Sequence, residues 1–241
     1  MSGGASRLRP VGVFGGTFNP VHHGHLRSAV EVREQLGLSE VRLVPAARPP
    51  HREAPCAAAT HRLAMVELAL SETPGLRADD REIRREGPSW MVDTLASFRA
   101  EKPGRPLFLI IGQDAANGLD RWHRWRELFE FAHLAIMRRP DARVDYAAEL
   151  AREVAQREAQ KSEELLVRPA GGCVALPVTA LALGLVGSAA ALGTERLLRS
   201  VKQGNISGIL PDQAPGDINS GENAEFMGVR CFTPTLASNM I

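Results

Sequence analysis

Residues 11–25 read VGVFGGTFNPVHHGH. The apolar run 11–14, followed directly by Gly15 and Gly16, predicts a buried strand that enters a tight turn. Two glycines let the backbone turn sharply and let a ligand approach the main chain. Gly24 opens a predicted helix over 25–36, whose first-turn N–H groups carry the positive end of the helix dipole. The stretch therefore predicts a strand–turn–helix unit that can hold an anion.

Strands and helices alternate through the first 140 residues. Strands are predicted over 41–45, 107–111 and 134–137, and helices over 60–70, 92–99 and 122–131. This alternation predicts an α/β fold with a doubly wound, mostly parallel, Rossmann-like sheet. Ligands bind beyond the carboxyl ends of the strands in such sheets. The rule selects 15–24, 45–52 and 112–114 as the segments that meet a ligand.

The pattern changes beyond residue 141. Residues 146–166 predict an exposed helix or helical hairpin, 176–183 the last strand, and 204–241 disorder, because they are rich in Gly, Asn, Ser and Pro. The uncharged stretch 169–194 ends in an apolar run that is short and glycine-rich for a membrane helix, so we interpret it as a buried strand plus loop. We therefore expect an α/β domain over 1–183 and a diverged or partly disordered region over 184–241.

Composition narrows the functional classes. The 241 residues are 44% hydrophobic and 24% charged, which is enough to bury a core. A net charge of +1 and an aromatic content of 5% argue against a dedicated nucleic-acid binder. Cys56, Cys173 and Cys231 lie far apart without a CxxC pair, which favours a reducing, cytoplasmic compartment. The first residues lack the apolar segment of a secretory signal.

His22 and His25 are the candidate catalytic residues. They lie three residues apart at the junction of turn and helix, so both imidazoles can point at one phosphate. A protonated histidine donates hydrogen bonds to phosphate oxygens at physiological pH. Nucleotidyl transfer needs positioning and charge stabilisation and no protein nucleophile. A metal site is the alternative, but residues 15–25 contain no Cys, Asp or Glu that would complete one.

The segment GGTFNPVHHGH resembles the signature of the HxGH nucleotidylyltransferases, and specifically of the nicotinate-nucleotide adenylyltransferase family. HxGH alone is shared with pantetheine-phosphate and cytidylyl transferases. Further segments narrow the resemblance, and together they cover residues 11 to about 141: RPPHR at 48–52, PSWMVDTL at 88–95, IGQD at 111–114 with Trp122 and Trp125 beyond it, and Arg139-Pro140.

The resemblance implies a role for each matching position. His22 and His25 would contact the ATP phosphates and stabilise the transition state. The residues that would line the nucleotide crevice are Gly15, Gly16, Thr17, Phe18, Gly24, His51, Gly112, Asp114 and Arg139. The nicotinate group would be held by the segment at Trp90 and Met91 and by stacking on Trp122. Structural roles stay open for three of these residues: Trp122 as core, Asp114 as a helix N-cap and Arg139 as a solvated charge.

The activity that the resemblance implies is transfer of AMP from ATP to nicotinate mononucleotide, which gives deamido-NAD and pyrophosphate in NAD biosynthesis. Mg²⁺ would be bound with ATP through the triphosphate oxygens, so no protein metal site is expected. Nucleic acid and membranes are not expected partners, and the oligomeric state stays open. The alternatives are a nucleotide-binding homologue with impaired catalysis and another HxGH transferase, such as a nicotinamide mononucleotide adenylyltransferase.

The chain departs from the family pattern at several positions. Ala46 stands where the family often has Asn, and Trp90 replaces the usual Tyr. Residues 185–190 read LVGSAA in place of a Ser/Thr-rich turn that grips the triphosphate. We hypothesise that the chain leaves the family's reading frame near residue 184, which fails if no shifted frame of the coding DNA restores that turn. The alternative is a diverged tail in which Ser188 and Arg196 supply the grip.

Overall fold

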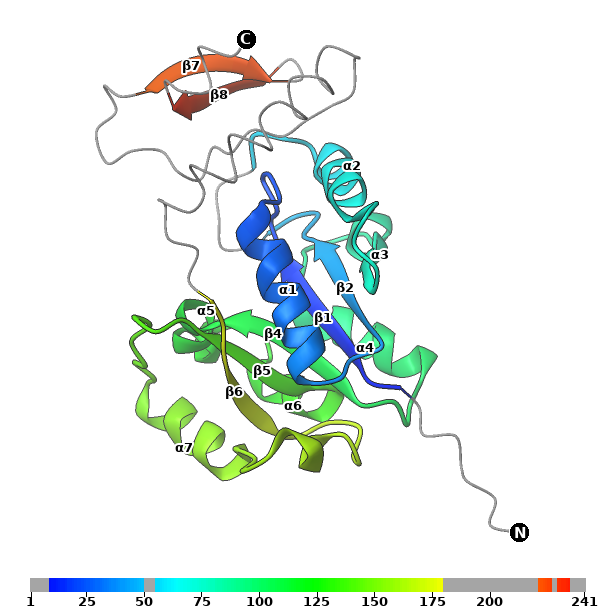
Figure 1. Ribbon diagram of the computed structural model, residues 1–241, viewed down its shortest axis with the longest axis vertical. Coiled ribbons are helices and arrows are strands. Elements are labelled where there is room, and N and C mark those ends of the chain that lie inside the picture. The colour runs from blue at the N-terminus through cyan, green and yellow to red at the C-terminus, as the bar shows by residue number, and fades with distance from the viewer. Residues whose placement is uncertain (1–8, 50–54, 180–220, 227–228, 235–241) are drawn as a thin grey trace.

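The computed structural model describes residues 9–49, 55–179, 221–226 and 229–234. Six strands form one sheet in the order β3-β2-β1-β4-β5-β6, and every neighbouring pair is parallel (Figure 1). The strands are β1 (Val11–Gly16), β2 (Glu40–Pro45), β3 (Leu76–Ala78), β4 (Leu107–Gly112), β5 (His133–Arg138) and β6 (Cys173–Pro177). The doubly wound sheet and its four central strands are confirmed.

Helices cover both faces of the sheet, which is why the strands are nearly continuous apolar runs. The helices are α1 (His23–Gln35), α2 (Ala59–Leu70), α3 (Arg81–Arg84), α4 (Met91–Glu101), α5 (Gln113–Asn117), α6 (Leu128–Phe131) and α7 (Ala148–Arg157). The predicted helices at α1, α2 and α4 are confirmed, with α1 beginning two residues earlier than expected.

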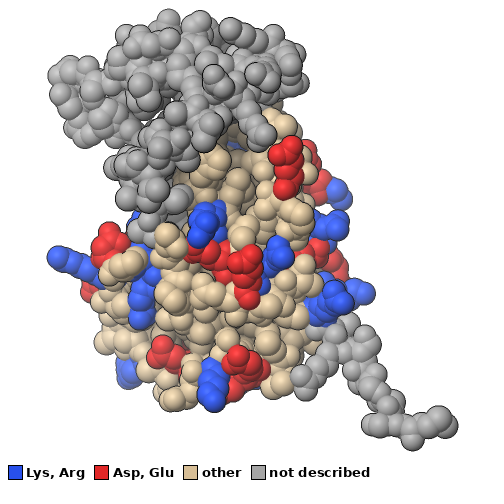
Figure 2. Space-filling model, viewed as in Figure 1, with Lys and Arg blue, Asp and Glu red and all other residues tan. Residues whose placement is uncertain are grey.

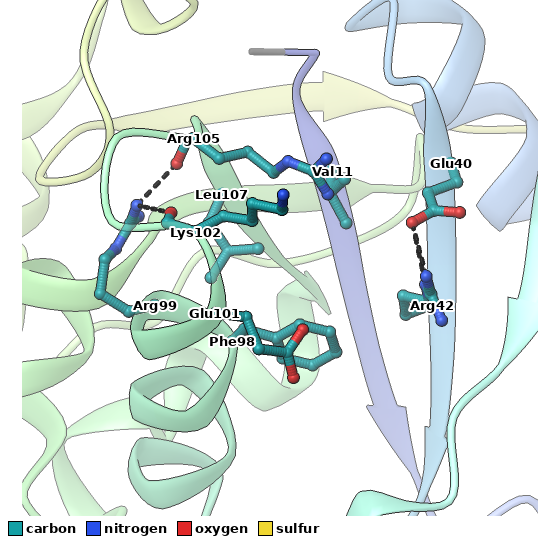
Figure 3. Close-up of a pocket in the computed structure, with 9 residues that line it drawn as sticks. All are labelled: Val11, Glu40, Arg42, Phe98, Arg99, Glu101, Lys102, Arg105 and Leu107. Carbon is teal, nitrogen blue, oxygen red and sulfur yellow. Dashed lines mark hydrogen bonds and ion pairs between the residues drawn. The ribbon is translucent and has the colours of Figure 1, made fainter.

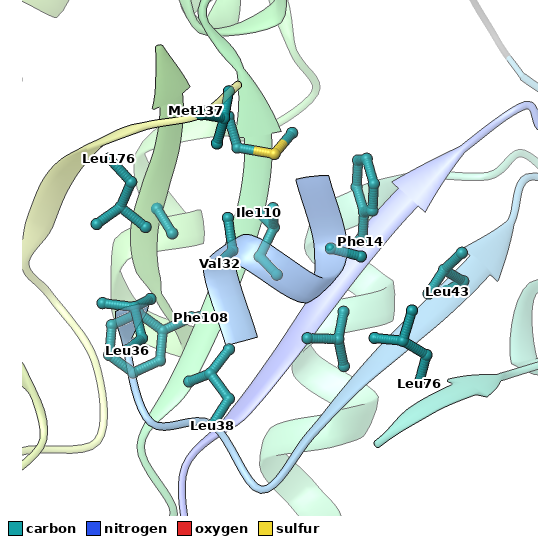
Figure 4. Packing of buried hydrophobic residues seen from close by; sticks show 14 of the residues in the cluster. Phe14, Val32, Leu36, Leu38, Leu43, Leu76, Phe108, Ile110, Met137 and Leu176 are labelled. Atoms are coloured by element: carbon teal, nitrogen blue, oxygen red, sulfur yellow. The ribbon is translucent and has the colours of Figure 1, made fainter. Parts of the chain in front are cut away.

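Two hydrophobic clusters lie on opposite faces, and β4 contributes alternate residues to each. Phe108 and Ile110 join the cluster that α1 covers through Val32 (Figure 4). Leu109 joins the other cluster, where α4 contributes Leu95 and α6 and α7 also pack. Because successive side chains of a strand point to opposite faces, β4 fixes both layers of helices at once.

The chain reverses its direction of travel along the sheet next to β1. From β1 it moves through β2 to the edge strand β3, and then returns to place β4 on the other side of β1. This is the point at which an open α/β sheet forms a ligand crevice beyond the strand ends. Gly16 and Gly112 are the last residues of β1 and β4. The fold therefore brings two of the three predicted ligand segments to the same crevice.

The expected helix over 122–131 is wrong in its first half. Trp122 is extended, Arg124 has a left-handed backbone with φ of 52°, and helical turns begin only at Trp125. Tertiary contacts explain the break: His123 stacks on Trp90, and Arg124 forms ion pairs with Asp93 and Glu127. These contacts hold 122–124 across the start of α4 instead of in a helix.

The expectations for residues 146–183 also need correction. Helix α7 ends at Arg157, and a short 3₁₀ turn, Ser162–Leu165, follows. The helix stops because Glu158 bridges to Cys173, and the Ala159 N–H donates to the Cys173 carbonyl at 2.8 Å. The last strand of the main sheet is Cys173–Pro177 and not 176–183, because its partner β5 ends at Arg138, opposite Pro177.

Part of the C-terminal region forms a second sheet. Strands β7 (Gly221–Phe226) and β8 (Val229–Pro234) pair antiparallel, so the expected disorder over 204–241 is wrong for these residues. Val, Cys, Phe and Thr in β8 suit a strand.

Several expectations lie outside the described residues. These are the proposed boundary at residue 183, the apolar run that follows it, and the roles of Ser188 and Arg196. Within the described part of the chain, no helix is long and apolar enough to cross a bilayer.

His133 ties the amino end of β5 to the loop before β6. The side chain is fully buried, its Nδ1 accepts a hydrogen bond from the Gly172 N–H, and its Nε2 lies 2.9 Å from the Arg168 carbonyl. The pairing with Gly172 leaves the ring proton on Nε2, so the neutral imidazole satisfies both contacts. Burial lowers the pKa of His133 to about 4.

This arrangement predicts acid sensitivity. Because the folded pKa is about 4 and the ordinary value is 6.5, the unfolded state binds more protons between these two pH values. The free energy of unfolding should therefore fall as the pH drops from 6.5 to 4, by up to about 3 kcal/mol from this group. Urea unfolding of wild type and His133→Gln at pH 7.5, 6 and 4.5 measures the effect. Parallel pH curves for the two proteins would contradict the assignment.

Candidate functional site

The turn after β1 is built around a strained aromatic residue. Phe18 has a left-handed backbone, with φ of 47°, and its side chain is 2% exposed. Its ring packs edge-on against Phe14 and His25, with ring centroids 5.8 and 5.1 Å apart. The Phe18 ring thus packs against the His25 ring and restricts its orientation. Contact between the main chain of Gly15 to Phe18 and a nucleotide stays a prediction.

His22 and His25 form a close, tilted ring pair at the start of α1. Their ring centroids are 3.7 Å apart and their planes are inclined by 34°. The His22 N–H donates to Nδ1 of His25 at 3.2 Å, which leaves Nε2 as the position of the His25 ring proton. Helix α1 begins at His23, so Gly24 lies inside the first turn and does not precede the helix. His23, between them, is exposed.

The charge of His25 differs from the expectation. Burial, and then the neighbouring charge on His22, lower the pKa of His25 to about 3. Its ring is therefore neutral at physiological pH, and the expectation of a protonated donor is wrong for this residue in the protein by itself. A neutral imidazole still donates one hydrogen bond through Nε2.

Met91, in the predicted nicotinate segment, lies against the glycine turn. A Cβ placed on Gly15 would lie 2.2 Å from the Met91 Cε, so the methionine side chain covers that glycine. Trp90 stacks on His123, with centroids 4.6 Å apart, and Trp122 is half-buried against the same cluster. The fold thus gathers Trp90, Met91 and Trp122 on one side of the crevice.

Asp114 and Arg139 lie together on the other side of β1, at the ends of β4 and β5. Their side chains form an ion pair of 3.1 Å, and they are 79% and 55% exposed. The residue that caps α5 is Gly112, so the alternative of Asp114 as an N-cap is wrong. Arg139 is paired and not simply a solvated charge. An exposed ion pair stabilises a fold very little, so both groups remain available to a ligand.

A cavity of about 370 Å³ opens beyond the ends of β5 and β6. Its lining residues are Arg138, Arg139, Pro140, Ala142, Ala175, Pro177 and Val178. A second cavity, at the amino ends of the strands near Arg99 and Arg105, encloses about 30 Å³ (Figure 3). That volume suffices for about one water molecule, so of these two cavities only the first has room for part of a nucleotide.

Ser89, just before α4, is hydrogen-bonded to the loop after β2. The Ser89 hydroxyl accepts hydrogen bonds from the N–H groups of Ala47 and Arg48, and the Ser89 N–H donates to the Arg48 carbonyl. Glu82 accepts hydrogen bonds from Ser89 and Thr94, and burial raises the pKa of Glu82. His51, which follows this loop, lies outside the described residues.

Several residues of the site were not predicted. These are Arg62, Glu82, Ser89, His123 and Arg138. For Arg62 the sequence carries a signal, because it shares a helical face with Met65 and Val66, where a charge is unexpected. His123 and Ser89 act through contacts between distant segments, which sequence spacing does not reveal.

Charge over the visible face of the molecule is mixed. Figure 2 shows Lys and Arg side chains interspersed with Asp and Glu and no broad region of one sign. Binding of an anion therefore depends on local groups such as the imidazoles, the first turn of α1 and Arg139. Among the described residues, no group of three or more His, Cys, Asp and Glu side chains gathers as a metal site would require.

Comparison with known proteins identifies similar chains. The cytidylyltransferase-like family model matches residues 13–171. A protein of Methylococcus capsulatus named "Probable nicotinate-nucleotide adenylyltransferase" is 44% identical over 203 residues, or 84% of this chain and 93% of that one. Proteins with the same name from Aeromonas hydrophila and Halorhodospira halophila are 49% and 46% identical, over 65% and 80% of this chain and 73% and 88% of theirs.

Solved structures share the fold. The nicotinic acid mononucleotide adenylyltransferase of Plasmodium falciparum, complexed with NaAD, has a TM-score of 0.53 at 14% identity, covering 81% of this chain and 89% of that one. The same protein complexed with APC has a TM-score of 0.51 and covers 79% of this chain and 84% of that one.

The contact between Gly15 and Met91 predicts a coupled pair of substitutions. Gly15→Ala should destabilise the protein by about 1 kcal/mol or less, because the added methyl group displaces only the flexible end of the Met91 side chain. In a Met91→Ala background the same substitution should cost clearly less, since the space is then open. Thermal or urea unfolding of the four proteins in this double-mutant cycle measures the coupling. Additive effects would show that the two side chains do not compete for this space.

Proposed function

Because the chain belongs to the nicotinate-nucleotide adenylyltransferase family, within the cytidylyltransferase-like proteins, we propose that it transfers AMP from ATP to nicotinate mononucleotide. The products are deamido-NAD and pyrophosphate, and the reaction belongs to NAD biosynthesis. The observation that carries the proposal is the close His22–His25 ring pair at the β1–β4 crevice, with Met91 over the adjoining glycine turn.

The reaction is a direct displacement at phosphorus. A phosphate oxygen of nicotinate mononucleotide attacks the α-phosphorus of ATP, the new P–O bond forms, and the bond to the β-phosphate oxygen breaks. The electron pair of that bond leaves with pyrophosphate, so no protein nucleophile is required. The protein's part is to hold the two phosphates in line and to stabilise the charge that develops on the oxygens.

His22 and His25 supply hydrogen bonds at that charge. Nε2 of His25 donates as a neutral imidazole, preorganised by the His22 main chain and the Phe18 ring. A bound phosphate would raise the pKa of His25, because a nearby negative charge favours the protonated form. The first turn of α1 and the main chain of residues 15–18 add N–H donors at the same place.

The two substrates occupy opposite sides of β1. Trp90, Met91 and Trp122 form the aromatic and apolar side that receives the nicotinate ring, which suits stacking on a flat heterocycle. Gly112, Asp114 and Arg139 form the ATP side, next to the cavity beyond β5 and β6. Asp114 suits a ribose hydroxyl, and Arg139 suits a phosphate.

Mg²⁺ enters this proposal together with ATP. It prefers oxygen ligands, and the side chains of the crevice turn are imidazoles, so the triphosphate oxygens would be its ligands. When bound, Mg²⁺ neutralises charge on the triphosphate. A reducing, cytoplasmic setting is part of the proposal and is supported by Cys56 and Cys173, neither of which forms a disulfide.

The C-terminal region bears on the alternative of impaired catalysis. A 203-residue match in a 241-residue chain ends at residue 203 or later, so the likeness to the Methylococcus capsulatus protein extends beyond residue 184. This extension favours a diverged tail over a shifted frame, and sequencing of the coding DNA decides between them.

Pyrophosphate release tests the proposed function. Purified protein with ATP and Mg²⁺ is assayed with nicotinate mononucleotide, nicotinamide mononucleotide and phosphopantetheine in parallel. We expect turnover that is strongest with the acid mononucleotide. Stronger turnover with another acceptor would identify a different transferase. Binding of nicotinate mononucleotide without turnover would identify the impaired homologue.

Substitutions of the histidine pair form a sharper test. His25→Ala and His22→Ala should each lower kcat by about 10²–10³ or more without unfolding the protein, because each removes a preorganised donor. His25→Gln should retain more activity than His25→Ala, since the amide is a neutral donor near Nε2. His23→Ala is the matched control, because His23 is exposed, and it should leave activity unchanged.

Steady-state kinetics measure the activity of each variant, and thermal unfolding shows that each variant is folded. Full activity of either alanine variant would remove these histidines from the reaction. Equal loss in His25→Gln and His25→Ala would show that the charge of the ring, and not its N–H group, is what the reaction uses.

A further inference from the structure

Arg62 is the largest fully buried side chain among the described residues, at 1% exposure. Its guanidinium donates three hydrogen bonds, and all three acceptors are main-chain carbonyls. Nη1 lies 2.5 Å from the Thr17 oxygen, Nη2 lies 2.6 Å from the Ala46 oxygen, and Nε lies 3.1 Å from the Ala57 oxygen. Such charge-assisted bonds are among the stronger ones in proteins, and the planar guanidinium fixes their relative directions.

The three carbonyls belong to three separate segments at the carboxyl edge of the sheet. Thr17 lies in the turn after β1, Ala46 is the first residue after β2, and Ala57 precedes α2. The first two segments are also joined directly, because the Ala46 N–H donates to the Gly16 carbonyl at 2.9 Å. Arg62 therefore fixes the distance between the phosphate-facing turn and the loop after β2.

Arg62 also acts on the strained peptide of the turn. The Thr17 carbonyl and the Phe18 N–H belong to one trans peptide unit, so they point in opposite directions. With the carbonyl held by Arg62, the Phe18 N–H points away from it. Phe18 is left-handed at φ of 47°, a conformation that persists in a non-glycine residue only when its surroundings enforce it. Arg62 is one such restraint, and the Phe18 ring in turn supports His25.

We propose that Arg62 is a positioning residue for adenylyl transfer, which holds the Thr17–Phe18 peptide and the loop after β2 at the spacing that the two phosphates require. The proposal rests on the proposed function for its kinetic consequence. It does not place Arg62 in contact with a substrate. Misplacement of reacting groups by about 1 Å can cost a rate factor of about 10².

Arg99 offers a matched control. It is also an arginine whose hydrogen bonds go to main-chain carbonyls, those of Phe131, Lys102, Pro103, Arg105 and Pro169. Its place is at the amino ends of the strands, beside the small cavity (Figure 3), away from the histidine pair. Loss of Arg99 should therefore affect stability without changing the geometry of the reaction.

The test compares Arg62→Lys, Arg62→Met and Arg99→Met in the full chain. Pyrophosphate release is measured at a temperature at which circular dichroism shows each variant to be folded. We expect Arg62→Met to lower kcat about 10- to 100-fold, with a change in KM below about threefold, and Arg62→Lys to retain an intermediate kcat. Arg99→Met should keep the wild-type kcat even where its melting temperature falls as far.

A second readout does not depend on turnover. Amide hydrogen exchange over 15–20 and 46–48 should be faster in Arg62→Lys than in wild type, and unchanged there in Arg99→Met. If wild type itself fails to turn over nicotinate mononucleotide, the proposed function is wrong, and this exchange pattern still tests the positioning. If Arg62→Met does not fold, Arg62→Lys carries both measurements. A wild-type kcat in folded Arg62→Lys, or unchanged exchange over both loops, would overturn the proposal.

Discussion

β1 is hydrogen-bonded to β2 on one side and to β4 on the other, and the connections that follow these strands lead away in opposite directions along the sheet. In the part of the chain that the structure describes, no helix crosses the gap between the carboxyl ends of β1 and β4, so main-chain groups stay accessible in that gap. Everything described at the site follows from this gap. The glycine turn, the His22–His25 pair and the Asp114–Arg139 pair lie at its rim.

The site is organised more by directed dipoles than by net charge. His25 is neutral, and the guanidinium of Arg62 is hydrogen-bonded to carbonyl oxygens. The charge of Asp114 balances that of Arg139. An anion that enters this crevice meets donors that are already oriented, so little reorganisation is needed when its charge increases. A chain of net charge +1 can bind highly charged nucleotides in this way without attracting polyanions in general.

The sequence predicts well what depends on local pattern. The apolar runs of β1, β2, β4 and β5 and the helical patterns of α1, α2 and α4 were sufficient for the four central strands, for these three helices and for the position of the β1–β4 crevice. The errors have a common physical cause in contacts between distant segments. The Trp90–His123 stack breaks a predicted helix, the bridge from Glu158 to Cys173 ends another, and burial removes the charge expected on His25. β3 and α5 were missed because three to five residues carry too little periodicity.

Gly15, the last residue but one of β1, and Gly112, the last residue of β4, are under different constraints. A side chain at Gly15 would collide with Met91, whereas a Cβ at Gly112 meets no atom of the described residues within 4 Å, and its φ of −74° suits any amino acid. The fold itself therefore limits a side chain at Gly15 only through the flexible end of Met91, and it sets no such limit at Gly112. A stable fold alone thus strictly requires glycine at neither position, and only selection for a bound ligand would keep position 112 without a side chain.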